Sequence, residues 1–241
     1  MKLGTGREDN AMKKTAILFD AGGILLDEEE MEQNFCDFTV NILNRNGITY
    51  STNQYWKDIE ESVSCFAPRT RPFIFWKYSS GKRSTYEKIS MEFQQLRKQR
   101  LSTLNLMEGI TCELKKLACH FSFVLAWQYG ANIYELLDYH NIGNLFVNLL
   151  SQDDFTITKP DPRYLSHITD AAGFKTEECI MVGDRIDNDI VPAKSLKMGT
   201  VFIRTGIYKK QVPRDPYEIP DVTLDAIKGL SEAILLKWCN S

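Results

Sequence analysis

The sequence predicts an α/β fold in which a doubly wound parallel sheet carries an inserted helical domain. Short continuous apolar runs, of the kind found in strands that are buried on both faces, recur along the chain. Segments with the apolar spacing of helices separate these runs, and such alternation is typical of a doubly wound fold. The alternation stops over residues 28–105, where long amphipathic stretches indicate a separate helical unit.

Each element of the alternating part is predicted from a local pattern. Apolar runs predict strands at 15–19, 121–126, 146–150, 179–182 and 200–203, and helical spacing predicts helices at 108–119, 131–140, 162–172, 188–197 and 223–237. The helix at 162–172 also has end signals. Asp161 can cap it, Pro162 suits its first position, and Gly173 can close its end.

The interrupting segment is expected to contain helices at 31–45, 53–66 and 84–101. It is rich in aromatic residues, most of which need only form a small core of its own. Its stretch 69–77 combines cations with aromatic rings that could contact an anionic molecule, although charged runs usually face solvent. We therefore expect a core of residues 13–27 and 106–241, a helical cap of residues 28–105, and a disordered extension at 1–12.

Composition favours small-molecule chemistry in the cytoplasm. The net charge of −3 gives no electrostatic reason to expect a nucleic acid or membrane partner, and no apolar run reaches the roughly 18 residues of a membrane span. The first 14 residues lack the apolar segment of a signal peptide. The six cysteines form no C-x-x-C pair and are expected to be buried, reduced thiols. The oligomeric state is left open.

Charged side chains follow three of the predicted strands, at the edge where ligands bind in such sheets. Asp20 follows the first strand, where an isolated aspartate is usually only a turn former. Asp184 and Asp189 lie in an acidic loop after the fourth strand, and clustered carboxylates with free oxygens suit Mg²⁺. Lys159 follows the third strand and could extend a positive charge toward them, although alone it would be an ordinary surface lysine.

The order of these motifs resembles the haloacid dehalogenase-like hydrolase superfamily. Its members share a Rossmannoid core, and the resemblance is in particular to the subfamily with a helical cap inserted between the first motif and the second strand. It covers the chain from Lys13 onward, and its most specific stretches are KPDPRYL and VGDRIDNDIVPAKSLKMGT.

The resemblance implies roles for individual residues. In phosphatases of this superfamily the aspartate at the position of Asp20 attacks phosphorus and becomes an aspartyl-phosphate. The Asp20 carboxylate, the Gly22 carbonyl and Asp184 would hold Mg²⁺, with Asp189 supporting the site from behind. Lys159 would neutralise the nucleophile and the phosphoryl oxygens.

Two motifs depart from the family pattern. Active phosphatases carry a second aspartate, which serves as general acid, where this chain has Gly22. Losing positioned acid–base catalysis costs about 10²–10⁴-fold in rate, or roughly 3–5 kcal/mol of barrier. The phosphate-binding Ser or Thr at the end of the second strand is replaced by Ala126, although Trp127 or Gln128 could supply a donor from another angle.

Three functions remain open from the sequence. The first is a slow or specialised Mg²⁺-dependent phosphohydrolase of a small phosphorylated metabolite, suited to leaving groups that need no protonation. The second is a non-catalytic protein that binds such a metabolite, which the losses at Gly22 and Ala126 favour. Haloacid dehalogenation is the third, but it would not need the acidic loop that this chain retains.

Overall fold

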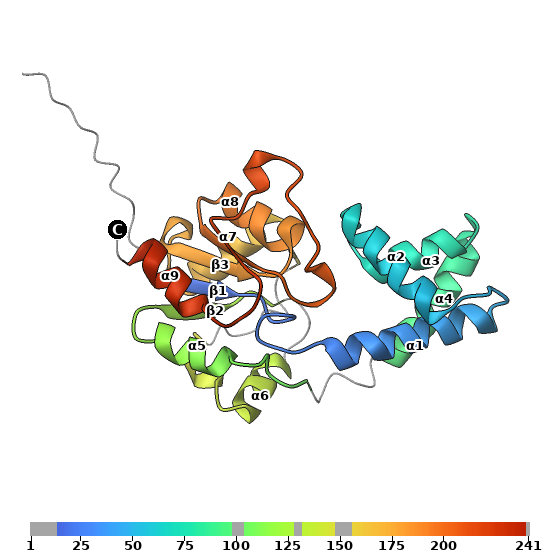
Figure 1. Cartoon of the computed structure of the whole chain (residues 1–241), viewed down its shortest axis with the longest axis horizontal. Coiled ribbons are helices and arrows are strands. Elements are labelled where there is room, and N and C mark those ends of the chain that lie inside the picture. Colours follow the sequence, from blue (N-terminus) through green and yellow to red (C-terminus); the bar gives the residue numbers. More distant parts are fainter. Residues whose placement is uncertain (1–13, 98–103, 128–131, 148–155, 240–241) are drawn as a thin grey trace, which may run out of the picture.

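The computed structural model describes residues 14–97, 104–127, 132–147 and 156–239, which form a parallel sheet with flanking helices and a helical insert (Figure 1). The five strands have the order β2-β1-β3-β4-β5, and all their pairings are parallel. They are β1 (Ala16–Phe19), β2 (Ser122–Leu125), β3 (Cys179–Gly183), β4 (Gly199–Ile203) and β5 (Val222–Leu224). This confirms the predicted fold class.

Helices cover both faces of the sheet. Successive side chains of a strand point to opposite faces, so each strand contributes to two apolar clusters. Ile17 and Phe19 of β1 belong to one apolar cluster, and Ala16 and Leu18 belong to another. The first cluster includes side chains of α5 (Ile110–Leu117), α6 (Asn132–Tyr139) and α9 (Leu230–Trp238), and the second includes side chains of α7 (Pro162–Ala171) and α8 (Val191–Ser195). Figure 1 shows α7 and α8 across the sheet from α5 and α6.

Local signals place α7 as predicted. The Asp161 side chain accepts a hydrogen bond from the backbone N–H of Arg163, and Pro162 occupies the first turn. Gly173 follows the helix with a φ of 82°, a left-handed conformation that favours glycine. The loop before α7, which contains Lys159, is therefore fixed at one end by a capped helix.

The helical insert comprises α1 (Glu29–Arg45), α2 (Thr52–Ser64), α3 (Thr70–Tyr78) and α4 (Arg83–Arg97). It lies beside the sheet rather than within its layers (Figure 1). The insert has its own apolar cluster, in which the Phe93 ring lies 5.3 Å from both the Phe35 and Phe75 rings. Its two connections to the sheet lie side by side and are joined by a hydrogen bond, in which the Asp27 N–H donates to the Asn105 carbonyl at 2.8 Å.

Three predicted elements of the α/β part differ from the structure. The helix predicted at 223–237 is wrong at its start, because Val222–Leu224 is strand β5 and α9 begins at Leu230. Gly229, with a φ of 91°, separates the two. The helix predicted at 188–197 is divided into a π-helical turn η5 (Ile186–Ile190) and α8, since Pro192 suits the first turn of a new helix.

The strand predicted at 146–150 is not formed in its described part. Phe146 makes only an isolated bridge with Phe123, and residues 148–150 lie outside the described residues. Helix α3 was not predicted, because its residues were interpreted only as a stretch of cations and aromatic rings.

The cysteine prediction is also partly wrong. All six cysteines are free, but only Cys36 and Cys179 are buried. The other four are exposed, because they lie near helix ends or on outward faces: Cys65, Cys112, Cys119 and Cys239. Among the described helices, none is both long and apolar enough to cross a membrane.

Candidate active site

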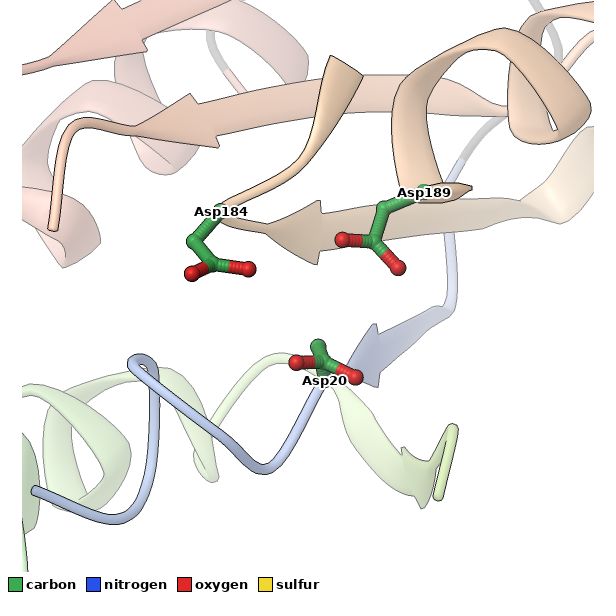
Figure 2. A group of neighbouring side chains, drawn as sticks. All are labelled: Asp20, Asp184 and Asp189. Carbon is green, nitrogen blue, oxygen red and sulfur yellow. The ribbon is translucent and has the colours of Figure 1, made fainter. Parts of the chain in front are cut away.

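The register of the central strands brings the candidate residues to one edge of the sheet. Phe19, the last residue of β1, pairs with Leu125 of β2 and Val182 of β3. Asp20 follows β1 directly, and its N–H donates to the Val182 carbonyl at 2.9 Å. Asp184 follows β3. Because parallel strands in register end together, the two carboxylates emerge at the same edge, as Figure 2 shows.

Three carboxylates at this edge form a cluster with the chemistry of a divalent-cation site. One oxygen from each of Asp20, Asp184 and Asp189 lies within 4.8 Å of the others. Figure 2 shows the three side chains pointing toward a common space, Asp189 from a helical turn and the other two from strand ends. Hard oxygen donors with this spacing fit Mg²⁺, which usually keeps several positions for water and phosphate.

Gly23 allows the chain to pass close to this cluster. Its φ is 69°, and a Cβ atom there would lie 2.8 Å from Asp184 Oδ2, closer than a side chain tolerates. The Thr205 hydroxyl donates to the Gly23 carbonyl at 2.7 Å. The glycine therefore satisfies both a left-handed turn and a close backbone approach to the carboxylate.

Lys159 is the buried cation of the site. Its side chain is 2% exposed, and its ammonium group donates to Asp189 Oδ1 at 2.7 Å and to Asp20 Oδ1. Burial alone would lower the pKa of Lys159, but the charges of Asp189 and Asp20 outweigh it and raise the pKa. The lysine is therefore held protonated between two carboxylates and is not the surface lysine that its sequence context alone would suggest.

The carboxylates carry more negative charge than this lysine neutralises. Burial raises the pKa of Asp20 to about 6, and the charge of Asp189 acts in the same direction while Lys159 opposes both. Burial also raises the pKa of Asp184, and the charges of Asp20, Asp189 and Glu28 add to this effect. A cation bound among these oxygens would relieve the repulsion, which is a physical reason to expect one.

Protein donors hold both oxygens of Asp189. Oδ1 accepts from Lys159, and Oδ2 accepts from the Arg185 backbone N–H at 3.1 Å. Asp189 therefore fixes the position of Lys159.

A cavity of about 310 Å³ opens from these carboxylates toward the helical insert. Core residues line one side of it: Asp20, Gly22, Trp127, Lys159, Asp184, Arg185, Asn188, Ile207 and Tyr208. Residues of the insert and its first turn line the other, among them Glu28, Glu32, Phe35, Arg69, Arg71 and Phe75. Arg71 is paired with the Glu32 carboxylate, and its guanidinium carbon lies 4.9 Å from the Phe35 ring centre. Lys77, from the same predicted stretch, binds Asp58 instead, at 2.8 Å.

The second-strand position has the predicted lack of a hydroxyl group. Ala126 is fully buried, and its N–H donates to the Phe19 carbonyl at 2.8 Å, so it lies level with Asp20. Trp127 lines the cavity, and its carbonyl accepts a hydrogen bond from the Tyr164 hydroxyl at 2.5 Å. Gln128 lies outside the described residues.

Several cavity residues were not predicted from the sequence. Tyr208 follows β4 and lies under Arg185, whose guanidinium carbon is 4.4 Å from the ring centre. No sequence pattern marked this pair. Glu28 belongs to an acidic run, residues 27–30, that is typical of a helix N-terminus, so its presence in the cavity could not be inferred from that pattern.

The fold and the site define a doubly wound α/β protein with a lysine and a carboxylate cluster at the carboxyl edge of its sheet. Residues 17–203 match the family model of the haloacid dehalogenase-like hydrolases. The chain belongs to this family, which confirms the resemblance inferred from the motifs.

Curated relatives agree with this assignment. The chain is 32% identical to a glyceraldehyde 3-phosphate phosphatase of Methanopyrus kandleri over 93 residues, which are 39% of this chain and 40% of the relative. It is also 32% identical to a phosphoglycolate phosphatase of Vibrio parahaemolyticus over 100 residues, 42% of each chain. The chain thus spans less than half the length of these curated relatives.

The fold extends over nearly the whole chain. The crystal structure of a predicted phosphoglycolate phosphatase from Haemophilus somnus superposes with a TM-score of 0.65 at 17% identity. The match covers 91% of this chain and 97% of that one, so the helical insert is included in the shared fold.

Proposed function

We propose that this protein is a Mg²⁺-dependent phosphohydrolase that acts on a small phosphorylated metabolite through an aspartyl-phosphate on Asp20. The observation that carries the proposal is the buried ammonium group of Lys159, which binds Asp20 in the cavity wall beside two further carboxylates. A phosphate group placed there would meet a carboxylate nucleophile and a fixed positive charge together.

Each residue of the cluster has a separate task in this proposal. A carboxylate oxygen of Asp20 attacks phosphorus, and Lys159 orients that carboxylate and stabilises negative charge on the phosphoryl oxygens. Asp189 holds Lys159 in place through the 2.7 Å hydrogen bond. The residues present fit Mg²⁺, which Asp20, the Gly22 carbonyl and Asp184 would hold, and when bound it would neutralise phosphoryl charge.

The helical insert acts in this proposal as a cap over the site, with residues 28–105 as the cap and 13–27 with 106–241 as the core. Its side chains line the same cavity as the catalytic edge, which supports this role. Segments 27–30 and 102–108 are the proposed hinges for opening and closing, and residues 102–103 of the second lie outside the described residues. A volume of about 310 Å³ is at the low end of ligand pockets, which favours a small substrate. The phosphatase relatives act on small organic phosphates, as their names state.

A second candidate is a protein that binds a phosphorylated metabolite without hydrolysing it. The absence of side-chain functions at Gly22 and Ala126 favours it. The two candidates share the anion site and differ only in turnover.

The test is release of inorganic phosphate from a panel of small alkyl and aryl phosphates, with Mg²⁺ and with a chelator. We expect hydrolysis only with Mg²⁺, and a loss of at least about 10³-fold in kcat in Asp20→Asn, which lacks the nucleophile. Calorimetric binding of the same esters without any phosphate release would instead support the binding candidate. Equal hydrolysis by wild type and Asp20→Asn would contradict an aspartyl-phosphate route.

A further inference from the structure

The carboxyl group that Gly22 lacks is replaced in space by another carboxyl group. A Cβ atom added to Gly22 would lie 2.6 Å from Glu28 Oε1, 2.8 Å from its Cδ and 2.9 Å from its Oε2. The Glu28 carboxylate therefore occupies the space into which a side chain of residue 22 would extend. The carboxyl oxygens of an aspartate are two bonds from its Cβ, so they would lie at a similar distance from that point.

A tight turn brings Glu28 back to Gly22. The Gly23 N–H donates to the Leu26 carbonyl at 3.0 Å, and Gly22 and Leu26 form an isolated bridge. This turn loops the chain back after β1, so the residue six positions after Gly22 returns to its side. The proximity is therefore built into the backbone of the first motif.

The Glu28 side chain is not used to cap the helix that it precedes. Glu28 is the N-cap residue of α1, but its carboxylate makes no capping hydrogen bond. The Asp27 carboxylate performs that task, accepting from the Glu29 N–H at 2.9 Å. The Glu28 side chain instead lines the cavity with Asp20 and Gly22, and its charge contributes to the field at Asp184.

The other carboxyl groups that line the described part of the cavity have different partners. Glu32 is paired with Arg71, Asp20 is bound by Lys159, and Asp184 is in the acidic cluster with Asp20 and Asp189. Glu28 is the one of these four that lies at the position of the missing aspartate.

We propose that Glu28 is the general acid and base of this site, in place of the carboxyl group that residue 22 lacks. This inference rests on the proposed phosphohydrolase function and names the residue that completes it. The evidence is the position of the Glu28 carboxylate against Gly22, its place in the cavity beside Asp20, and its release from helix capping.

Glu28 gives a proton in the first step, transfer of the phosphoryl group to Asp20, and takes one back in the second, hydrolysis of the aspartyl-phosphate. As an Asp20 oxygen forms a bond to phosphorus, the bond from phosphorus to the leaving oxygen breaks, and the Glu28 carboxyl group gives its proton to that oxygen. An alcohol leaves, and Glu28 is then a carboxylate. Water next attacks the aspartyl-phosphate, Glu28 takes a proton from this water, and the Asp20–phosphorus bond breaks. Inorganic phosphate, the Asp20 carboxylate and protonated Glu28 result, so the cycle closes.

The first test is Glu28→Gln, which keeps the shape of the side chain but cannot transfer the proton. For the alkyl phosphate that wild type hydrolyses fastest, we expect kcat to fall by at least about tenfold, a conservative part of the roughly 10²–10⁴-fold gain from positioned acid–base catalysis. The matched control is Glu29→Gln, which removes the same charge from the adjacent, exposed residue and should leave kcat unchanged.

Leaving-group dependence separates catalysis from a structural role. With 4-nitrophenyl phosphate, whose leaving group needs little protonation, Glu28→Gln should release a burst of about one nitrophenol per enzyme and then turn over slowly. The burst is expected because the first step no longer needs the acid while hydrolysis of the aspartyl-phosphate still needs the base. A structural defect would instead slow both steps and give no burst.

A rescue variant tests the spatial replacement directly. Gly22 does not have a left-handed φ, and the obstacle to a side chain there is the Glu28 carboxylate. On the alkyl phosphate, the double variant Gly22→Asp with Glu28→Ala should therefore have a kcat at least about tenfold higher than that of Glu28→Ala alone.

The outcomes separate the role of Glu28 from the proposed phosphohydrolase function. If Asp20→Asn abolishes hydrolysis of the alkyl phosphate but Glu28→Gln keeps wild-type kcat, the role of Glu28 is wrong and the proposed function stands. If wild type hydrolyses no ester in the panel, the proposed function is wrong, and the role of Glu28 is wrong with it. A folded double variant without recovery would also overturn the replacement.

Discussion

The carboxyl edge of the sheet and the helical insert line the same cavity, but they place their side chains by different means. At the sheet edge, Asp20 and Asp184 emerge from strands whose register is fixed by backbone hydrogen bonds. In the insert, Arg71 is held by a salt bridge to Glu32 and by the Phe35 ring on helices that pack around an aromatic cluster. The edge is thus suited to chemistry that needs fixed geometry, and the insert to selection of the substrate.

Among the changes that compare the two regions, the largest effect should come from removing the cation of the sheet edge. Lys159→Met leaves Asp20 and Asp189 without their shared partner, and breaking a buried ion pair by losing one member costs about 3–5 kcal/mol of stability. We also expect kcat to fall by about 10²–10³-fold, the cost of losing one electrostatic stabiliser of the transition state. Urea denaturation and phosphate release measure the two effects.

The matched control for this variant is Lys228→Met, which removes the same charge from an exposed position. It should change neither stability nor turnover appreciably. If Lys159→Met behaved like this control, the edge would not depend on its buried cation, and the contrast with the insert would disappear.

A smaller effect should appear in the pH dependence of stability of the metal-free protein. The pKa of Asp20 is raised to about 6, above its unfolded value of about 3.9. The folded state therefore binds the proton more tightly, and the stability this provides is present below about pH 4 and lost as the pH rises through about 6. A shift of about two pKa units corresponds to about 3 kcal/mol.

This pH dependence is measured as the free energy of unfolding in urea, with a chelator, from pH 4 to 7. Asp20→Asn lacks the titrating group and should show a correspondingly flatter profile. Saturating Mg²⁺ should raise the free energy of unfolding of the wild-type protein at the upper end of this pH range, because the bound cation compensates the carboxylate charge. Identical profiles for wild type and Asp20→Asn would contradict the raised pKa.

The smallest effect should come from the insert. Arg71→Ala removes a guanidinium group from the cavity wall, and we expect KM for the alkyl phosphate to rise by about tenfold, about 1.4 kcal/mol, with less change in kcat. Arg83→Ala is the control, because Arg83 lies on α4 of the same insert with a side chain that is 87% exposed. A fall in kcat with unchanged KM would place Arg71 with the chemistry of the sheet edge instead.

Much of the fold could be predicted because parallel strands and their helices leave strong local patterns. The runs that became β1 to β4 are apolar because both faces of the sheet are covered. The pattern failed at β5, where Leu224, Ile227 and Leu230 have helical spacing although they belong to a strand, a turn and a helix. Short apolar runs do not distinguish such cases, since pairing with β4 decides the conformation.

The sequence by itself determined the fold class, the family, and which motifs end at the reactive edge, because strand ends and motif order are local properties of the chain. The tertiary structure decided that Lys159 is buried between Asp20 and Asp189, since that contact joins segments more than 130 positions apart on one side and 30 apart on the other. It also decided that Glu28 lies against Gly22 and that Arg71 reaches the cavity. The position of Arg71 depends on helix packing, and that of Glu28 depends on a short turn that no residue pattern in the sequence singled out.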